Sequence, residues 1–218
     1  MNVSRDREAP RRSKLASLTR LVARHGWHSP FLLILRVVTA LDFSQFKRRS
    51  MIRLLNHASV GRNVKIGRCV FISPGAHIHI GDDVYIGDGC VIEIDIGKDL
   101  GLQIGSGTWI SHGAHIQAAN GLKIGANVLI GEYVSIRDRS HRSDESAVPI
   151  RTSGDVVGKI LIEDDVWIGR GCGVFANGKS LTIASGAIIG ANSVVTKSVP
   201  KNVIRYDGRA VQTKPRLT

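Results

Sequence analysis

The sequence predicts an all-β solenoid of about six coils that follows a short α-helical segment. An aliphatic residue followed by glycine recurs at six-residue spacing between Val60-Gly61 and Ile189-Gly190. The fourth residue after each aliphatic is small or β-branched, as at Cys90 and Val128. Two inward positions in every six residues describe a short strand and a corner, and repetition at a fixed period indicates coils stacked around one core. A β-sandwich would alternate with period two instead.

Residues 1–55 are predicted to form a basic and mainly helical segment. Ser29-Pro30 is typical of a helix start, another helix is expected from Ser44 to about Leu55, and four aliphatic residues share one face of an earlier helix. These are Leu15, Leu18, Leu21 and Val22. The apolar stretch Phe31–Leu41 is too short to span a bilayer and contains an arginine. No signal-peptide cleavage site follows it.

The charge of this segment allows two interpretations. Residues 1–55 carry 12 Lys/Arg against 3 Asp/Glu, out of a net charge of +12 for the whole chain. The helices are expected to cap the open edge of the first coil, and a second interpretation adds contact with anionic lipid at the inner face of a membrane. Nucleic acid is not expected as a partner, because no known nucleic-acid motif accompanies the basic charge.

Residues 56–200 are predicted to form the coils, with three hexads in each turn. Asn or Asp before the small position, as at Asn63 and Asn127, suits corners that need left-handed backbone geometry. Three cysteines without CxxC spacing give neither a zinc site nor a disulfide framework, and Cys90 and Cys172 occupy inward positions. A reducing compartment, the cytoplasm, is therefore expected. Residues 201–218 are predicted to be a basic C-terminal tail.

The repeat is interrupted once, by residues 137–159, and a long polar loop in a compact repeat is usually functional. His141 lies in this loop, close to Arg142, Asp144 and Glu145. A neutral imidazole oriented by a neighbouring carboxylate can act as a general base near neutral pH. His141 is therefore a candidate catalytic base, although a lone histidine in a loop is more often simply solvated, and Arg142 and Asp144 are candidate substrate-binding residues.

Several motifs occur together in a fixed order. The hexads of Ile124–Ile136 are followed by the His141 loop, by Val166-Trp167-Ile168-Gly169, and by the segment from Ile189 to Pro200 that reads IGANSVVTKSVP. This order resembles the hexapeptide-repeat acyltransferase superfamily, most of all bacterial sugar and polysaccharide O-acetyltransferases. The resemblance covers about residues 58–205.

The resemblance implies a left-handed parallel β-helix, an exception to the usual right-handed crossover. It also implies a homotrimer with each site between two subunits. The activity implied is acetyl-CoA-dependent transfer, without a metal, to a hydroxyl of a saccharide acceptor in surface polysaccharide biosynthesis. His141 falls at the family's catalytic histidine. Positions near the coenzyme are matched by Trp167, Gly169, Ala191, Thr196 and Lys197.

The sequence departs from the family pattern at two candidate sites. Ser111, next to His112, stands where the galactoside and maltose enzymes place an acceptor-binding asparagine, so these two residues are the candidates for acceptor binding. Arg209 replaces a proline in the loop that would cover the coenzyme and adds a cation there.

Three alternative functions remain. One is an N-acetyltransferase of a nucleotide-linked amino sugar, and another is a catalytically inactive β-helix scaffold. The third is a γ-class carbonic anhydrase, whose paired zinc ligands are separated by four residues. His112 and His115 are separated by two, which is a poor match.

Overall fold

The computed structural model describes residues 48–52, 56–74, 77–95, 101–142, 149–207 and 211–215. Residues 48–52 are helical and lie within the helix predicted from Ser44. The other predicted N-terminal helices, Asp144 and Arg209 lie outside the described residues. Within the described ranges, no helix has the length and hydropathy needed to cross a membrane.

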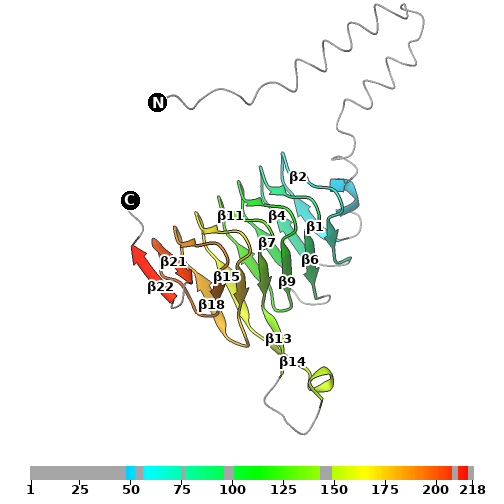
Figure 1. The fold of residues 1–218 in the computed structure, drawn as a ribbon. Coiled ribbons are helices and arrows are strands. Elements are labelled where there is room, and N and C mark those ends of the chain that lie inside the picture. The colour runs from blue at the N-terminus through cyan, green and yellow to red at the C-terminus, as the bar shows by residue number, and fades with distance from the viewer. Residues whose placement is uncertain are drawn as a thin grey trace, which may run out of the picture. The chain divides into compact units, whose positions relative to one another are not determined.

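The described chain winds into a parallel β-helix of six coils, and each coil contributes one strand to each of three sheets (Figure 1). Sheet A contains β1 (His57–Val60), β4 (His77–Ile80), β7 (Leu102–Ile104), β10 (Leu122–Ile124), β15 (Lys159–Ile162) and β18 (Ser180–Ile183). Sheet B contains β2 (Lys65–Ile66), β5 (Tyr85–Ile86), β8 (Trp109–Ile110), β11 (Leu129–Ile130), β16 (Trp167–Ile168), β19 (Ile188–Ile189), β21 (Val203–Asp207) and β22 (Val211–Pro215). Sheet C contains β3 (Phe71–Ile72), β6 (Val91–Ile94), β9 (His115–Ala118), β12 (Ser135–Arg137), β17 (Gly173–Phe175) and β20 (Val194–Val195). The predicted solenoid of six coils is confirmed.

The core is a set of aliphatic ladders that run along the coils. In sheet B, the register aligns Ile66 with Ile86, and the same inward position is isoleucine in every coil up to Ile189. These side chains are at most 2% exposed. Cys90 and Cys172 are buried as predicted, and burial raises the pKa of both thiols. Stacking of identical side chains explains why a core with few aromatic residues can still be continuous.

The corners have the backbone geometry that the sequence predicted. Asn63, Asp83, Asn127, Asp165 and Asn192 all have positive φ. Asparagine and aspartate tolerate this region better than other residues with a side chain.

Tyr133 is an unexpected member of the corner set, with φ of 57°. Its ring lies over Gly113, where a Cβ atom would stand 2.6 Å from it. A bulky side chain in the left-handed region is an outlier that the surrounding structure must hold in place.

The predicted tail continues sheet B. β21 pairs in parallel with β19 and antiparallel with β22, and the register places Arg205 opposite Ile189. Arg205 is only 8% exposed, and its guanidinium donates hydrogen bonds to the carbonyl oxygens of Val194 and Lys197. Arg205 therefore covers the C-terminal end of the core, although the sequence places it in the predicted basic tail.

Candidate active site

A two-stranded antiparallel sheet leaves the coils between β12 and β15 and carries the predicted catalytic histidine. It pairs β13 (Arg139–His141) with β14 (Asp155–Val157), and Figure 1 shows it projecting from the coils. The register places His141 directly opposite Asp155. The His141 Nδ1 atom lies 3.0 Å from Asp155 Oδ1, and 72% of the histidine side chain is exposed.

This contact determines how the imidazole can act. A carboxylate only accepts hydrogen bonds, so a neutral His141 carries its proton on Nδ1 and donates it to Asp155. The Nε2 atom is then unprotonated and can accept a proton. Within the described residues, the carboxylate that orients His141 is thus Asp155, from the opposite strand of the hairpin.

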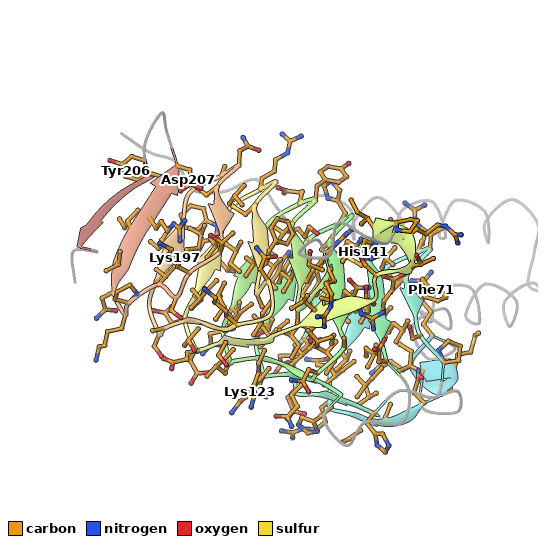
Figure 2. The ribbon with its side chains drawn as sticks, turned by 90° about the horizontal axis from the view of Figure 1, so that it is seen from below. Phe71, Lys123, His141, Lys197, Tyr206 and Asp207 are labelled. Atoms are coloured by element: carbon orange, nitrogen blue, oxygen red, sulfur yellow. The ribbon has the colours of Figure 1, made fainter. Side chains whose placement is uncertain are left out.

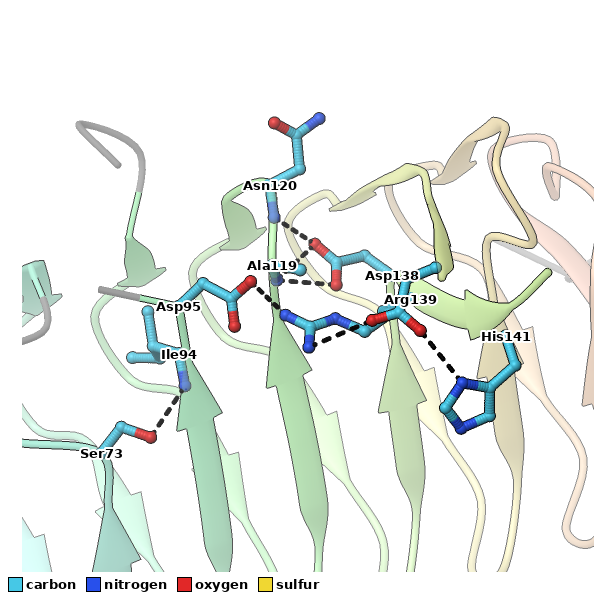
Figure 3. Close-up of polar contacts among 9 residues, drawn as sticks. Ser73, Ile94, Asp95, Ala119, Asn120, Asp138, Arg139 and His141 are labelled. Atoms are coloured by element: carbon cyan, nitrogen blue, oxygen red, sulfur yellow. Dashed lines mark hydrogen bonds and ion pairs between the residues drawn. The ribbon is translucent and has the colours of Figure 1, made fainter. Parts of the chain in front are cut away.

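Asp155 is itself held by a cation. Arg139 NH1 lies 3.5 Å from Asp155 Oδ2, and Arg139 NH2 pairs with Asp95 at the end of β6 (Figure 3). The Arg139 side chain is 25% exposed, so solvent only partly screens these pairs. The chain of contacts from Asp95 to His141 ties the hairpin to sheet C.

A buried acid anchors the base of the hairpin. Asp138 is fully buried, and its carboxylate accepts hydrogen bonds from the backbone N–H groups of Ala119 and Asn120 (Figure 3). Burial raises the pKa of the Asp138 carboxyl, and these hydrogen bonds oppose that shift. The backbone carbonyl of Asp138 accepts a hydrogen bond from Gly158 N at 2.6 Å. Asp138 thereby positions both strands of the hairpin without touching His141.

His141 lines a pocket of about 400 Å³ between the hairpin and sheet C. The pocket floor includes Gln117 and Arg137 from β9 and β12 and Phe175 from β17. This volume lies in the range of pockets for small ligands.

The predicted acceptor residues lie in a different place. Ser111 and His112 follow β8 and line an open groove of about 900 Å³ with Trp109 and Tyr133. The His112 ring contacts the Tyr133 ring edge-on at 5.1 Å. Neither Ser111 nor His112 lines the pocket that contains His141. Arg142 is the one predicted substrate-binding residue near His141 that the structure describes; it is half-buried, and its backbone N–H donates to Gly154 O at 2.9 Å.

The predicted coenzyme residues are divided between two surfaces. Trp167 is 51% exposed on sheet B, and Gly169 and Ala191 follow β16 and β19 at the corner between sheets B and C. Thr196 and Lys197 are exposed directly after β20 of sheet C, toward the C-terminal coils (Figure 2). Thr196 and Lys197 therefore lie at sheet C, which also lines the His141 pocket. Trp167, Gly169 and Ala191 lie at sheet B, which lines the Ser111 groove.

The sequence alone did not single out Asp155, Arg139 or Asp138 as site residues. A signal existed for Asp155, since a loop that leaves and re-enters the coils can form a hairpin in which distant residues face each other. Without the register, however, no residue could be chosen.

The two histidines considered as zinc ligands make other contacts. His115 Nε2 lies 3.0 Å from Glu93 Oε2, and His112 contacts Tyr133. Among the residues that the structure describes, no group of three His, Cys, Asp or Glu side chains could hold a metal ion.

Comparison with known proteins places these features in context. No family model matches the chain. A Schizosaccharomyces pombe protein named as an acetyltransferase is 40% identical over 84 residues, which are 38% of this chain and 38% of that protein. Galactoside O-acetyltransferase of Lactococcus lactis is 32% identical over 84 residues, again 38% of each chain. The chain therefore spans well under half the length of these relatives.

Solved structures share the fold over most of the chain. The N-acyltransferase AntD of Bacillus cereus, in complex with dTDP and coenzyme A, has a TM-score of 0.62 at 23% identity and covers 78% of this chain and 89% of its own. A hexapeptide-repeat acetyltransferase of Vibrio cholerae, complexed with acetyl coenzyme A, has a TM-score of 0.56 at 24% identity, with 82% and 79% covered. The resemblance to the hexapeptide-repeat acyltransferases is confirmed. At this identity the solved structures establish the fold alone.

Proposed function

We propose that the protein is an acetyl-CoA-dependent O-acetyltransferase that acts on a hydroxyl group of a saccharide. The observation that carries the proposal is the His141 and Asp155 pair, which leaves an unprotonated Nε2 at the edge of a pocket on this fold. The names of the relatives, which include a galactoside O-acetyltransferase, support the reaction.

The chemistry follows from that geometry. His141 Nε2 removes the proton of the acceptor hydroxyl, and the oxygen attacks the carbonyl carbon of the acetyl thioester. The tetrahedral adduct collapses, the C–S bond breaks, and the thiolate of coenzyme A takes the proton from the imidazolium. Asp155 stabilises the imidazolium while it exists, as a carboxylate can when it accepts the Nδ1 hydrogen bond.

Acetyl-CoA supplies the activated acetyl group, and the exposed cation after β20 fits its phosphates. Lys197 offers an ammonium group to a phosphate, and Thr196 offers a hydroxyl beside it. Trp167, Gly169, Ala191 and Arg209 are proposed to complete this binding region. Two complexes of structural neighbours, one with coenzyme A and one with acetyl coenzyme A, support this assignment.

A homotrimer would join the two separate surfaces. Sheet B exposes Trp109, Leu129 and Trp167, each about half-exposed, in one continuous ladder. Such an apolar surface marks an interaction site. We propose that this face of one subunit meets the hairpin of the next, which would bring the partner subunit's Ser111 and His112 toward His141.

The acceptor and the cellular setting are proposed from the resemblance. A role in surface polysaccharide biosynthesis at the cytoplasmic side fits the sugar O-acetyltransferases that the chain resembles. AntD, an N-acyltransferase that is also known in complex with dTDP-4-amino-4,6-dideoxyglucose and coenzyme A, supports an amino sugar as the second candidate acceptor.

The test combines activity with assembly. Release of coenzyme A is measured with acetyl-CoA and a panel of hydroxyl and amino sugars, for the native protein, His141→Ala and the control His79→Ala on the outer face of β4. His141→Ala should lower kcat by about 10²–10⁴-fold, and His79→Ala should leave it unchanged. Turnover that survives His141→Ala would refute the proposal, and transfer only to amino sugars would favour the second candidate.

Light scattering tests the assembly directly. We expect about three times the chain mass of 23.6 kDa. Leu129→Glu should reduce both this mass and the activity, because it places a charge in the middle of the exposed ladder. A monomeric native protein with full activity would contradict the shared site.

A further inference from the structure

The floor of the His141 pocket carries three side chains of different character. Gln117, Arg137 and Phe175 occupy equivalent outward positions on β9, β12 and β17, because the register pairs Arg137 with both of the others. All three line the same pocket as His141. A ligand that presents a hydroxyl to His141 Nε2 therefore lies over an amide, a guanidinium and an aromatic ring.

Arg137 keeps its charge available to a ligand. Its NH2 group lies 3.2 Å from His115 Nδ1, and His115 Nε2 lies 3.0 Å from Glu93 Oε2. Arginine can only donate, so His115 Nδ1 is an acceptor and the imidazole proton is on Nε2, where it is donated to Glu93. The histidine is then neutral, and it orients Arg137 without neutralising it.

The other arginine of the pocket differs in this respect. Arg139 is paired with two carboxylates, those of Asp95 and Asp155. In the described part of the chain, no carboxylate lies within ion-pair distance of Arg137, whose side chain is exposed. An exposed, oriented guanidinium facing a pocket is well suited to a carboxylate or a phosphate.

Phe175 adds an apolar surface next to this cation. Its ring lies over Gly173, since a Cβ atom at that glycine would stand 2.5 Å from the ring. The lack of a side chain at residue 173 therefore lets the ring lie along the sheet. The apolar face of a sugar ring packs well on a flat aromatic surface, and Gln117 can donate to and accept from sugar hydroxyls.

We propose that the acceptor is an acidic saccharide, whose carboxylate or phosphate group binds Arg137 while its ring packs on Phe175. This proposal rests on the proposed O-acetyltransferase function and specifies the acceptor of that same site. His141 then deprotonates a hydroxyl of the same sugar unit. Arg137 is a specificity residue, and His115 is a positioning residue that acts through it.

The experiment compares acceptors that differ only in their charged group. Release of coenzyme A is measured for D-glucose, D-glucuronate and D-glucose 1-phosphate, with native protein, Arg137→Gln, Arg137→Lys and the control Lys123→Gln. Lys123 is exposed on β10 of sheet A, away from the pocket, and its loss changes the net charge equally (Figure 2).

The native protein should prefer an acidic acceptor, and the preferred one tells a carboxylate site from a phosphate site. Arg137→Gln should raise the KM for that acceptor by about 10- to 100-fold, which corresponds to one charge-assisted hydrogen bond. It should leave the KM for acetyl-CoA within about threefold, and it should raise the KM for glucose much less than the KM for the acid. Arg137→Lys should retain part of the preference, and Lys123→Gln all of it.

Three results would overturn the proposal. In the first, the native protein turns over glucose and the acidic sugars equally well. In the second, Arg137→Gln loses activity equally with charged and neutral acceptors. In the third, Arg137→Gln changes only the KM for acetyl-CoA. If no acceptor is turned over, the O-acetyltransferase function fails by itself. Ligand-observed NMR with the same three sugars then decides the present proposal. The proposal requires that saturation transfer to an acidic sugar is stronger than saturation transfer to glucose. It also requires that this difference is lost in Arg137→Gln.

Discussion

Replacing Asp155 by asparagine removes the charge that orients His141 and changes the side chain's size very little. In the structure, Asp155 Oδ1 lies 3.0 Å from His141 Nδ1 and carries the negative charge that would stabilise an imidazolium. A hydrogen bond to a charged group contributes about 1.5–3 kcal/mol. At 1.36 kcal/mol for each factor of ten in rate, its loss lowers kcat by about 10- to 150-fold.

The position within this range depends on two opposing effects. His141 is 72% exposed, so water can replace part of the lost hydrogen bond, which favours the lower end. The asparagine amide can also donate a hydrogen bond to Nδ1, which would hold the imidazole proton on Nε2. Because Nε2 must be unprotonated to act as the base, this effect favours the upper end of the expected loss in kcat. The KM for acetyl-CoA should stay unchanged, because Asp155 is proposed to act only through His141.

Steady-state release of coenzyme A, together with thermal unfolding, measures both aspects. Loss of the partly exposed contact between Asp155 and Arg139 is worth about 0–1 kcal/mol, so Tm should fall by less than about 4 °C. Asp83→Asn is the matched control, since Asp83 lies at a corner with φ of 57°, which asparagine tolerates. A kcat for Asp155→Asn within threefold of the native value would refute the assignment of Asp155.

Other predictions concern the hairpin base, the corner, the coenzyme and the basic segment. Asp138→Ala should lower the free energy of unfolding by about 3 kcal/mol, seen as a fall in Tm of about 6–12 °C, because it leaves buried N–H groups unpaired; an unchanged Tm would contradict this. Tyr133→Asn should raise stability by about 0.5–1 kcal/mol in a denaturant titration by relieving strain, and a clear loss would mean that the ring contacts dominate. Lys197→Ala should weaken acetyl-CoA more than dephospho-CoA, by about tenfold; equal weakening would show that this lysine does not bind the 3′-phosphate. If residues 1–55 contact lipid, the protein should co-sediment with anionic vesicles at low salt and less at high salt, and deletion of residues 1–12 should weaken this binding. Absence of binding at low salt would leave capping of the first coil as the proposed role of this segment.

The coils could be predicted from the sequence because each coil repeats the same residue pattern and buries the same positions against its neighbours. Ile66 and Ile86 are buried for the same reason as their successors, namely contact with the coil before and the coil after. The corners were predictable for a similar reason, since Asn63 and Asn127 prefer the backbone geometry that every corner needs. His141 could be proposed as a site residue because a polar loop inside a regular repeat stands out without any knowledge of its shape.

The partners of these residues were decided only by the tertiary structure. Asp155 faces His141 because of the register between β13 and β14, and a shift of one residue would have turned it to the other face. Arg205 turns inward because its strand extends sheet B at the inward position of Ile189. Ser111 and Arg137 lie in separate pockets because Ser111 follows a strand of sheet B, whereas Arg137 is the last residue of a strand of sheet C. Residue type and period determine which side chains are buried, whereas the pairing of distant strands determines which of the remaining side chains come into contact.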